Sequence, residues 1–285
     1  MFGFLNVNKP SGITSHKVIS MLRKITGIKQ IGHAGTLDPL ASGVLPVAIG
    51  KAAKLIDYLP EDKEYIAGMY LGKVSDTFDI EGSVEETYAK KAELSEIENV
   101  LNEFRGLTTQ IPPAFSAVHY NGKRLYELAR KGTIPDDIPK REINIYKNEI
   151  VSFDFEKQIL KLDIECSKGT YIRTIINDIG KALGTGAVMY ELVRVKSASL
   201  TLENSLILDE SMTKSDIEKN IIPPQNILPI HCIEIKKSDF EKVKNGNKIE
   251  NVYNAENTVI LTFNNIPLAL SVSENEFIQP KKLLI

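Results

Sequence analysis

Apolar residues recur at helical spacing in three segments of the chain, and each stripe predicts an amphipathic helix. The first segment begins at Thr14 or Ser15, either of which is a good N-cap, and closes at Gly27. The second is acidic, and the third starts where Thr170 can cap the helix and ends at Gly184. The stripes are Val18, Met21, Leu22 and Ile25; Leu94, Ile97, Leu101 and Phe104; and Ile172, Ile175, Ile176, Ile179 and Leu183.

Other segments show the short apolar runs and the alternation that are typical of strands. Residues 3–8, 44–49 and 64–72 predict single strands, and Pro46 suits the end or the edge of a sheet because proline has no N–H. Residues 151–166 predict a hairpin in which each strand has one apolar face. Its apolar positions are Val151, Phe153 and Phe155, then Leu160, Leu162, Ile164 and Cys166.

The pattern changes after the proline-rich stretch Ile222-Pro223-Pro224, which we interpret as a linker. Beyond it we predict a short helix over 237–244 and a strand pair over 259–263 and 268–272. A chain of 285 residues is long enough for one large core and one small one. We therefore predict a large domain over residues 1–225 and a small β-rich domain over residues 226–285.

Composition is that of a soluble globular protein, with 42% hydrophobic and 25% charged residues. No secretory leader and no apolar run that could span a bilayer is present, so the default is a cytoplasmic protein without a membrane partner. The two cysteines are far apart and the four histidines form no metal-binding pattern, so a catalytic metal is not expected. Gly50-Lys51 lacks the spacing and the hydroxyl of a phosphate-binding loop, which argues against a nucleotide cofactor.

Net charge is −2, which argues mildly against a nucleic-acid partner, but the charges are unevenly distributed. Residues 1–58 carry seven Lys or Arg against two Asp. Residues 119–131 interleave two tyrosines with cations, an arrangement that suits looped RNA because bases stack on rings while cations hold phosphates. An ordinary helix with surface lysines and core tyrosines explains the same pattern. The residues are Tyr120, Tyr126, Lys123, Arg124, Arg130 and Lys131.

One loop stands out, because residues 32–43 hold three glycines and a proline in twelve positions and so exclude both a helix and a regular strand. Asp38 lies between Leu37 and Pro39. Pro39 restricts the backbone of Asp38 to extended conformations, so covalent geometry sets the direction of the carboxylate. An Asx turn before proline is the alternative interpretation.

A second stretch, residues 166–174, turns from the predicted hairpin into the third helix and places Tyr171 and Arg173 at the junction. Functional side chains are often held at such junctions by rigid elements on both sides. Both stretches resemble motifs of the TruB-type pseudouridine synthases, whose pattern G-H-x-G-x-L-D-P-x-A-x-G-x-L is met by residues 32–45. Residues 8–15 and 112–132 are similar to two further motifs of that family.

The resemblance covers residues 3–198 strongly and the tail weakly, and it implies both a fold and an activity. The implied fold is α+β, with a central mixed, largely antiparallel sheet, flanking helices and a small PUA-like RNA-binding domain at the C-terminus. The implied activity is a cofactor-free isomerisation of uridine-55 in the T-loop of tRNA. The implied partner is the T-arm stem-loop of tRNA, without an obligate protein partner.

The resemblance also implies roles for individual residues. Asp38 is the nucleophile, and we expect Arg173 to be its ion-pair partner because a guanidinium can aim a carboxylate bidentately. Tyr65 stacks on the flipped uracil, while Tyr171 and Leu192 line the pocket. His33 fills the space that the base leaves in the RNA. Taken singly, Tyr65 and Leu192 are also explained as core residues, and His33 as a hydrogen-bonding loop residue.

Part of the chain departs from the family pattern, and other functions remain open. Val188 replaces an aromatic residue or His, and Ser197-Ala198 replaces a frequent glycine, which affects the pocket rim.

A non-catalytic RNA-binding module would explain the basic segment, but it has no use for a carboxylate that repels phosphate. A guide-dependent dyskerin-type synthase would carry longer extensions. A hydrolase is disfavoured, because no G-x-S-x-G is present.

Overall fold

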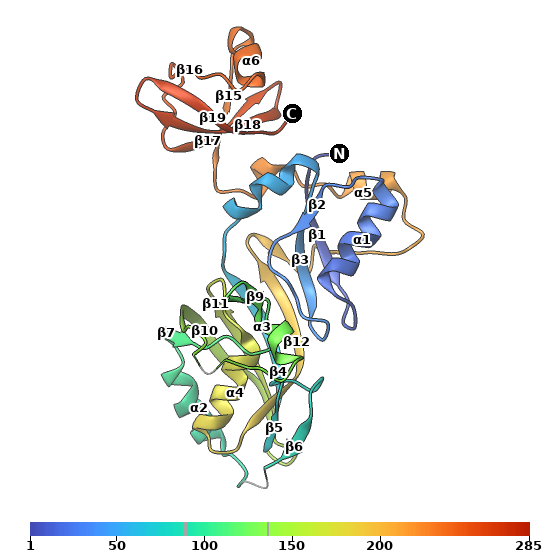
Figure 1. Cartoon of the computed structure of the whole chain (residues 1–285), viewed down its shortest axis with the longest axis vertical. Helices are drawn as coiled ribbons and strands as arrows, with labels where there is room; N and C mark the ends of the chain where they lie inside the picture. The colour runs from blue at the N-terminus through green and yellow to red at the C-terminus, as the bar shows by residue number, and fades with distance from the viewer. Residues whose placement is uncertain (88–89, 136) are drawn as a thin grey trace. The chain divides into compact units, whose positions relative to one another are not determined.

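The computed structural model describes residues 1–87, 90–135 and 137–285, coloured along the chain in Figure 1. Its internal contacts divide the chain into two compact units, which are described separately here. Unit 1 consists of Met1–Pro39, Gly43–Pro60 and Ala198–Ile285, and unit 2 of Leu40–Ser42 and Glu61–Ser197.

Unit 1 contains a small mixed sheet built on β1, which pairs in parallel with β14 and antiparallel with β3. β2 adds to the other side of β3, antiparallel to it. The strand predictions for 3–8 and 44–49 are confirmed. The strands are β1 (Gly3–Lys9), β2 (Ile31–His33), β3 (Ser42–Ile49) and β14 (Leu206–Ile207).

Pro46 lies inside β3, between two pairing partners, so the expectation of a strand end or edge is wrong. The carbonyl of Pro46 accepts the N–H of Ala34 (2.9 Å), and Ala34 is the residue that follows β2. Because N and O of one strand residue point to the same side, the missing N–H of Pro46 faces the place where β2 ends. The ladder with β1 on the opposite side keeps its donors, and only the end of the pairing with β2 lacks one, which explains why an interior strand tolerates proline.

Helix α1 (Ser15–Thr26) begins and ends where the sequence predicts. The Thr14 hydroxyl accepts the N–H of Lys17 (3.1 Å) at the N-terminus. Gly27 closes the helix with a left-handed φ of 73°, a conformation that glycine adopts without steric cost. The buried stripe of α1 packs in one core cluster with residues of β1 and β3.

The rest of unit 1 includes a five-stranded sheet in the order β15-β17-β18-β19-β16, which contains the predicted tail strands, and the predicted tail helix. The β-rich tail is therefore present. These and the remaining elements are η1 (Gly50–Tyr58), β13 (Leu200–Thr201), α5 (Lys214–Lys219), η2 (Pro224–Asn226), β15 (His231–Glu234), α6 (Lys237–Lys244), β16 (Ile249–Glu250), β17 (Thr258–Phe263), β18 (Ile266–Glu274) and β19 (Phe277–Leu283).

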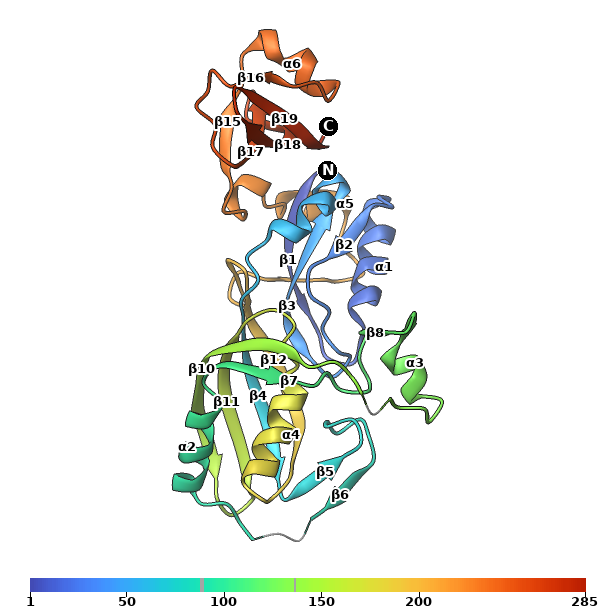
Figure 2. The same cartoon turned by 60° about the vertical axis from the view of Figure 1, so that its left-hand side comes forward.

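Unit 2 is built on an antiparallel sheet in the order β12-β4-β11-β10-β7. Helix α4 contacts β12 and β4, and Figure 2 shows it lying along this sheet. The apolar face of the sheet and the isoleucine stripe of α4 form the core of the unit. The elements are β4 (Lys63–Leu71), α2 (Leu94–Glu103), β7 (Gly106–Gln110), β10 (Arg141–Asp154), β11 (Ile159–Cys166), α4 (Ile172–Ala182) and β12 (Ala187–Ser197).

The predicted hairpin forms, and the four apolar residues of β11 are buried as expected. The apolar face expected for its first strand is wrong, because Val151 is 54% exposed and Phe155 is 38% exposed. The register between β10 and β11 shifts between Ile150 and Ser152, so Val151 is an extra, bulged residue. The bulge adds a residue that a pattern of alternation cannot reveal. Phe155 is exposed for another reason, because it lies in the turn just beyond the end of β10.

Two local predictions in unit 2 are also wrong. Leu94 is exposed, because it is the first residue of α2 and precedes the turns that pack. Thr170 does not cap α4: its hydroxyl donates to the Ser167 carbonyl (2.9 Å), and Tyr171 is the N-cap.

Two small hairpins and a short helix project from unit 2. They are β5 (Lys73–Ser75) with β6 (Val84–Glu86), and β8 (His119–Tyr120) with β9 (Lys123–Arg124), followed by α3 (Leu125–Ala129). Mixed but mainly antiparallel sheets with packed helices confirm the α+β class. Over the described ranges, no helix combines the length and the apolar character that crossing a membrane requires.

Candidate active site

Asp38 lies in the loop between β2 and β3, and the residues on both sides of it are fixed by the start of α1. The Ser15 hydroxyl donates to the Leu37 carbonyl (3.0 Å) and accepts the Leu37 N–H (2.9 Å). Gly12 donates its N–H to the Pro39 carbonyl (2.8 Å). Leu37 and Ser15 are buried while Asp38 is half-buried, so the loop that carries Asp38 is anchored by the neighbours of this residue.

Lys9 completes this anchor from inside the protein. Its side chain is fully buried, and its ammonium donates to the carbonyls of Ile13 (2.6 Å), Pro10 (2.9 Å) and Pro39 (3.4 Å). A buried ammonium needs such acceptors, because leaving one unsatisfied costs several kcal/mol. The stretch from Asn8 to Ser15 therefore acts as the support of the Asp38 loop, a role that its sequence did not show.

Replacing Lys9 with Met tests this support. We expect the free energy of unfolding to fall by about 2 kcal/mol, because three carbonyls lose a charged donor. Urea denaturation measures the change, and Lys17→Met on the exposed side of α1 is the control. Equal stability of the two variants would show that Lys9 does not hold the loop.

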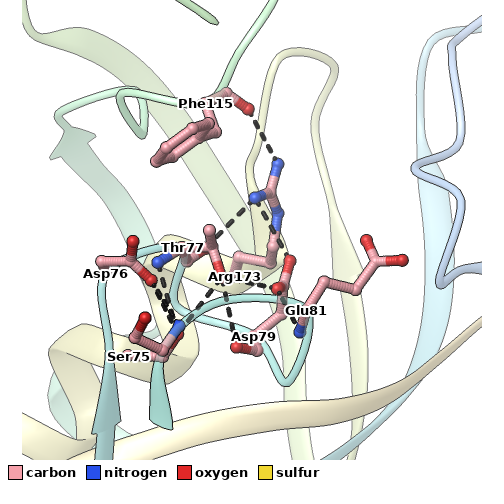
Figure 3. A network of polar contacts seen from close by, with 8 residues as sticks. Ser75, Asp76, Thr77, Asp79, Glu81, Phe115 and Arg173 are labelled. Carbon is pink, nitrogen blue, oxygen red and sulfur yellow. Dashed lines mark hydrogen bonds and ion pairs between the residues drawn. The ribbon is translucent and has the colours of Figure 1, made fainter. Parts of the chain in front are cut away.

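Arg173, in the first turn of α4, is buried with 6% exposure and is surrounded by oxygen atoms of unit 2. Its Nη1 lies 3.3 Å from Asp79 Oδ2 and donates to the Thr77 carbonyl (3.2 Å). Its Nη2 donates to the Phe115 carbonyl (3.2 Å). Figure 3 shows the guanidinium between Phe115 and the turn that carries Asp79. Contacts on both terminal nitrogens fix the plane of the guanidinium, which a lysine could not reproduce.

Asp79 is itself held rigidly in a polar turn, residues 75–83. Its Oδ1 accepts the Thr77 hydroxyl (2.7 Å) and the Glu81 N–H (3.0 Å). The backbone on either side is tied to Met189 of β12, through the Phe78 carbonyl (3.1 Å) and the Ile80 N–H (3.0 Å). Phe78 has a φ of 66°, which is strained for a bulky residue. The turn therefore presents one buried carboxylate to Arg173 at some conformational cost.

Tyr65 and Leu192 lie next to each other on the apolar face of the sheet in unit 2. Tyr65 and Ala67 project from the same face of β4, and Ala67 pairs with Leu192 of β12. Arg194, only 1% exposed, pairs with Tyr65 in the same register. Lys63 lies one step further along this face, and burial lowers its pKa, with the Arg194 guanidinium lowering it further. The face thus combines an aromatic ring, an aliphatic wall and two cations.

The other predicted residues lie on separate elements. His33 ends β2 in unit 1, five residues before Asp38. The four cations are exposed, with Lys123 and Arg124 in β9 and Arg130 and Lys131 directly after α3. The Arg130 guanidinium lies 5.5 Å from the centre of the Tyr126 ring. Leu125 and Ala129 are the residues that α3 buries, so the alternative of a helix with core tyrosines does not describe this segment.

Among the predicted site residues of unit 2, Tyr65 and Leu192 lie side by side on the sheet, and Tyr171 and Arg173 lie in one turn. In unit 1, Asp38 and His33 lie in one loop region. Sequence reasoning missed Lys9, Ser15, Thr77 and Asp79. Asp79 gave no signal beyond its place in a polar turn. Among the residues that the structure describes, no group of three or more His, Cys, Asp or Glu side chains is arranged to hold a metal ion.

Comparison with known proteins adds an independent observation. Residues 23–172 match the profile described as TruB family pseudouridylate synthase (N terminal domain), and residues 173–222 match the tRNA pseudouridylate synthase B C-terminal domain. The chain is 39% identical to tRNA pseudouridine synthase B of Caldanaerobacter subterraneus subsp. tengcongensis, over 99% of this chain and 98% of that protein. It is 49% identical to the protein of the same name from Clostridium novyi, over 78% and 76% of the two chains.

A solved structure with a similar fold was also found. The chain in the crystal structure of a Cbf5-Nop10-Gar1 complex is 25% identical, with a TM-score of 0.73. The match covers 100% of this chain and 85% of that one.

Proposed function

Since this chain belongs to the TruB family of pseudouridylate synthases, we propose that it isomerises uridine 55 in the T-loop of tRNA to pseudouridine. The observation that carries the proposal is the identity of 39% with a tRNA pseudouridine synthase B along nearly the whole length of both proteins. The anchored Asp38 loop and the fixed Arg173 guanidinium support it, because both belong to motifs that this chemistry needs.

The reaction breaks the bond from C1′ of the ribose to N1 of uracil and joins C1′ to C5 of the same base, with loss of the C5 proton and gain of a proton at N1. It needs no redox partner and no added water, so no cofactor takes part. Asp38 is the nucleophile, which attacks the sugar or the base, or stabilises charge at C1′. Arg173 pairs with Asp38 and aims its carboxylate, while Asp79 and two carbonyls fix the plane of Arg173.

The target base is stacked inside an RNA loop, so it must be turned out of the stack before it can react. Tyr65 stacks on the flipped uracil, and Leu192, its neighbour on the sheet face, forms the apolar wall. Tyr171 lines the same pocket from the start of α4. His33 enters the RNA where the base has left.

The phosphates of the T-arm are held by the exposed cations in β9 and directly after α3, namely Lys123, Arg124, Arg130 and Lys131. Residues 1–225 form the catalytic domain, and residues 226–285 form a PUA-like domain that adds RNA contacts; the five-stranded sheet of that segment supports this assignment. The chain acts in the cytoplasm and without an obligate protein partner.

A stem-loop RNA with the T-arm sequence and tritium at uridine C5 tests the proposal, because the isomerisation exchanges the C5 label for a bond to C1′. The purified chain alone is expected to release the label, and the same RNA with the label only outside the T-loop is the control. Binding of the RNA without release would contradict the proposal and favour a non-catalytic RNA-binding module.

Stacking by Tyr65 has a separate test in two substitutions. Tyr65→Phe keeps the ring and is expected to bind the stem-loop as tightly as the unmodified chain. Tyr65→Leu loses the ring and is expected to bind about tenfold more weakly, since stacking of one base is worth about 1–3 kcal/mol. Filter binding measures both affinities, and equal losses for Phe and Leu would exclude stacking as the role of Tyr65.

A further inference from the structure

Gln110 is the last residue of β7, and its side-chain amide binds both the backbone N–H and the backbone carbonyl of Tyr171. Gln110 is buried with 5% exposure, although its side chain is polar. Its Oε1 accepts the N–H of Tyr171 (2.8 Å), and its Nε2 donates to the Tyr171 carbonyl (3.0 Å). A side-chain amide that bonds twice to one residue replaces the ladder that a neighbouring strand would supply, so it fixes both the position and the orientation of that residue.

Tyr171 is the residue from which α4 starts. Its carbonyl accepts the N–H groups of Thr174 (3.1 Å) and Ile175 (3.2 Å), which are the first hydrogen bonds of the helix. Arg173 follows two residues later in the same turn. Any shift of Tyr171 is therefore passed to Arg173, because the two are joined by a single rigid helical turn.

The chain that follows Gln110 makes a second contact with the same turn. After Ile111 come Pro112 and Pro113, whose fixed φ angles leave this stretch little freedom. Two residues later, the Phe115 carbonyl accepts from Nη2 of Arg173 (3.2 Å). One short, stiff segment therefore contacts the start of α4 twice. Gln110 binds the backbone of Tyr171, and the Phe115 carbonyl binds the guanidinium of Arg173.

We propose that Gln110 is a positioning residue for the isomerisation, which holds Tyr171 and, through the first turn of α4, Arg173 in the arrangement that reacts. The inference rests on the proposed function, because it states that Gln110 affects the rate of the proposed isomerisation. Loss of the amide leaves the Tyr171 N–H without this acceptor and lets the turn shift. A displacement of about 1 Å in a reacting arrangement costs about 10²-fold in rate.

The chain offers a matched control in Gln158, a second buried glutamine of unit 2. Its Oε1 accepts the N–H of Ala92 (2.8 Å), and its Nε2 donates to the Ala92 carbonyl (3.2 Å). Ala92 also stands just before a helix, in this case α2. The Gln158 Nε2 also donates to the Phe155 carbonyl (2.8 Å). Gln110→Met and Gln158→Met therefore both remove a pair of hydrogen bonds from a helix start, and Gln158→Met removes one bond more, but only Gln110 leads to Arg173.

The experiment measures the single-turnover rate of tritium release at saturating T-arm RNA, the dissociation constant for that RNA and the melting temperature of each variant. We expect Gln110→Met to react about 10²-fold more slowly than the unmodified chain, with its dissociation constant changed by less than about threefold. The melting temperature of Gln158→Met is expected to fall by at least as much, while its rate stays unchanged. If Gln110→Met does not fold, Gln110→Asn takes its place, because it retains the amide but is one methylene too short to reach Tyr171. Its single-turnover rate is then compared with that of Gln158→Met in the same way.

A rate for the Gln110 variant that equals that of Gln158→Met would overturn the inference, because a purely structural role moves both alike. An effect confined to the dissociation constant would overturn it as well. If the unmodified chain itself releases no label, the proposed function fails, and this outcome is distinct from a failure of the role of Gln110.

Discussion

Asp38→Asn is expected to abolish the isomerisation, lowering the rate of tritium release by about 10⁴-fold or more, while RNA binding stays within about twofold. The amide has nearly the volume of the carboxylate but no charge, so it can neither attack the substrate nor stabilise charge at C1′. The loop itself is held at Leu37 and Pro39, through Ser15, Gly12 and Lys9, and those contacts do not involve the altered side chain. Single-turnover release and filter binding of the T-arm RNA measure the two quantities.

Asp57→Asn is the matched control for Asp38, since Asp57 is an exposed carboxylate of the same unit, 3.9 Å from Lys282. It should leave both rate and affinity unchanged. Substantial release by the Asp38→Asn variant would remove Asp38 from the chemistry and reopen the search for the reacting group.

Arg173→Lys and Asp79→Asn form the second prediction, and both are expected to lower the rate by about 10²-fold or more with little change in RNA affinity. Lysine keeps the charge of Arg173, but a single ammonium cannot satisfy Asp79, the Thr77 carbonyl and the Phe115 carbonyl at once. Asparagine at position 79 removes the buried carboxylate charge that lies 3.3 Å from the guanidinium, so the free energy of unfolding should also fall by about 3 kcal/mol.

A surface ion pair of the same unit provides the comparison. Glu191→Gln removes the partner of Lys161, a pair with a separation of 2.6 Å in which both side chains are more than a third exposed. Its loss should change stability by less than about 0.5 kcal/mol and leave the rate unaltered. If Asp79→Asn behaves in the same way, Asp79 does not position Arg173.

Much of the secondary structure could be predicted, because short-range patterns decide it. Helix α1 is capped by Thr14 and Gly27, and both ends could be predicted because a hydroxyl cap and a left-handed glycine are local signals. The four buried residues of β11 follow from simple alternation. The pattern failed at Val151, where the pairing with β11 makes this residue an extra, bulged one that leaves the core face. It failed again at Pro46, whose interior place is allowed only because β2 ends beside it.

Sequence by itself determined the family and the chemical groups, because the motifs around Asp38 and Arg173 combine glycines, a proline and charged residues in a spacing with few other uses. Only the tertiary structure decided what holds those groups. Lys9 reaches Pro39 across 30 positions, Asp79 reaches Arg173 from a separate turn, and Gln110 reaches Tyr171 across 61 positions. Such contacts leave no periodicity in the sequence, since they depend on which buried polar atoms the folded chain brings within hydrogen-bonding distance of one another.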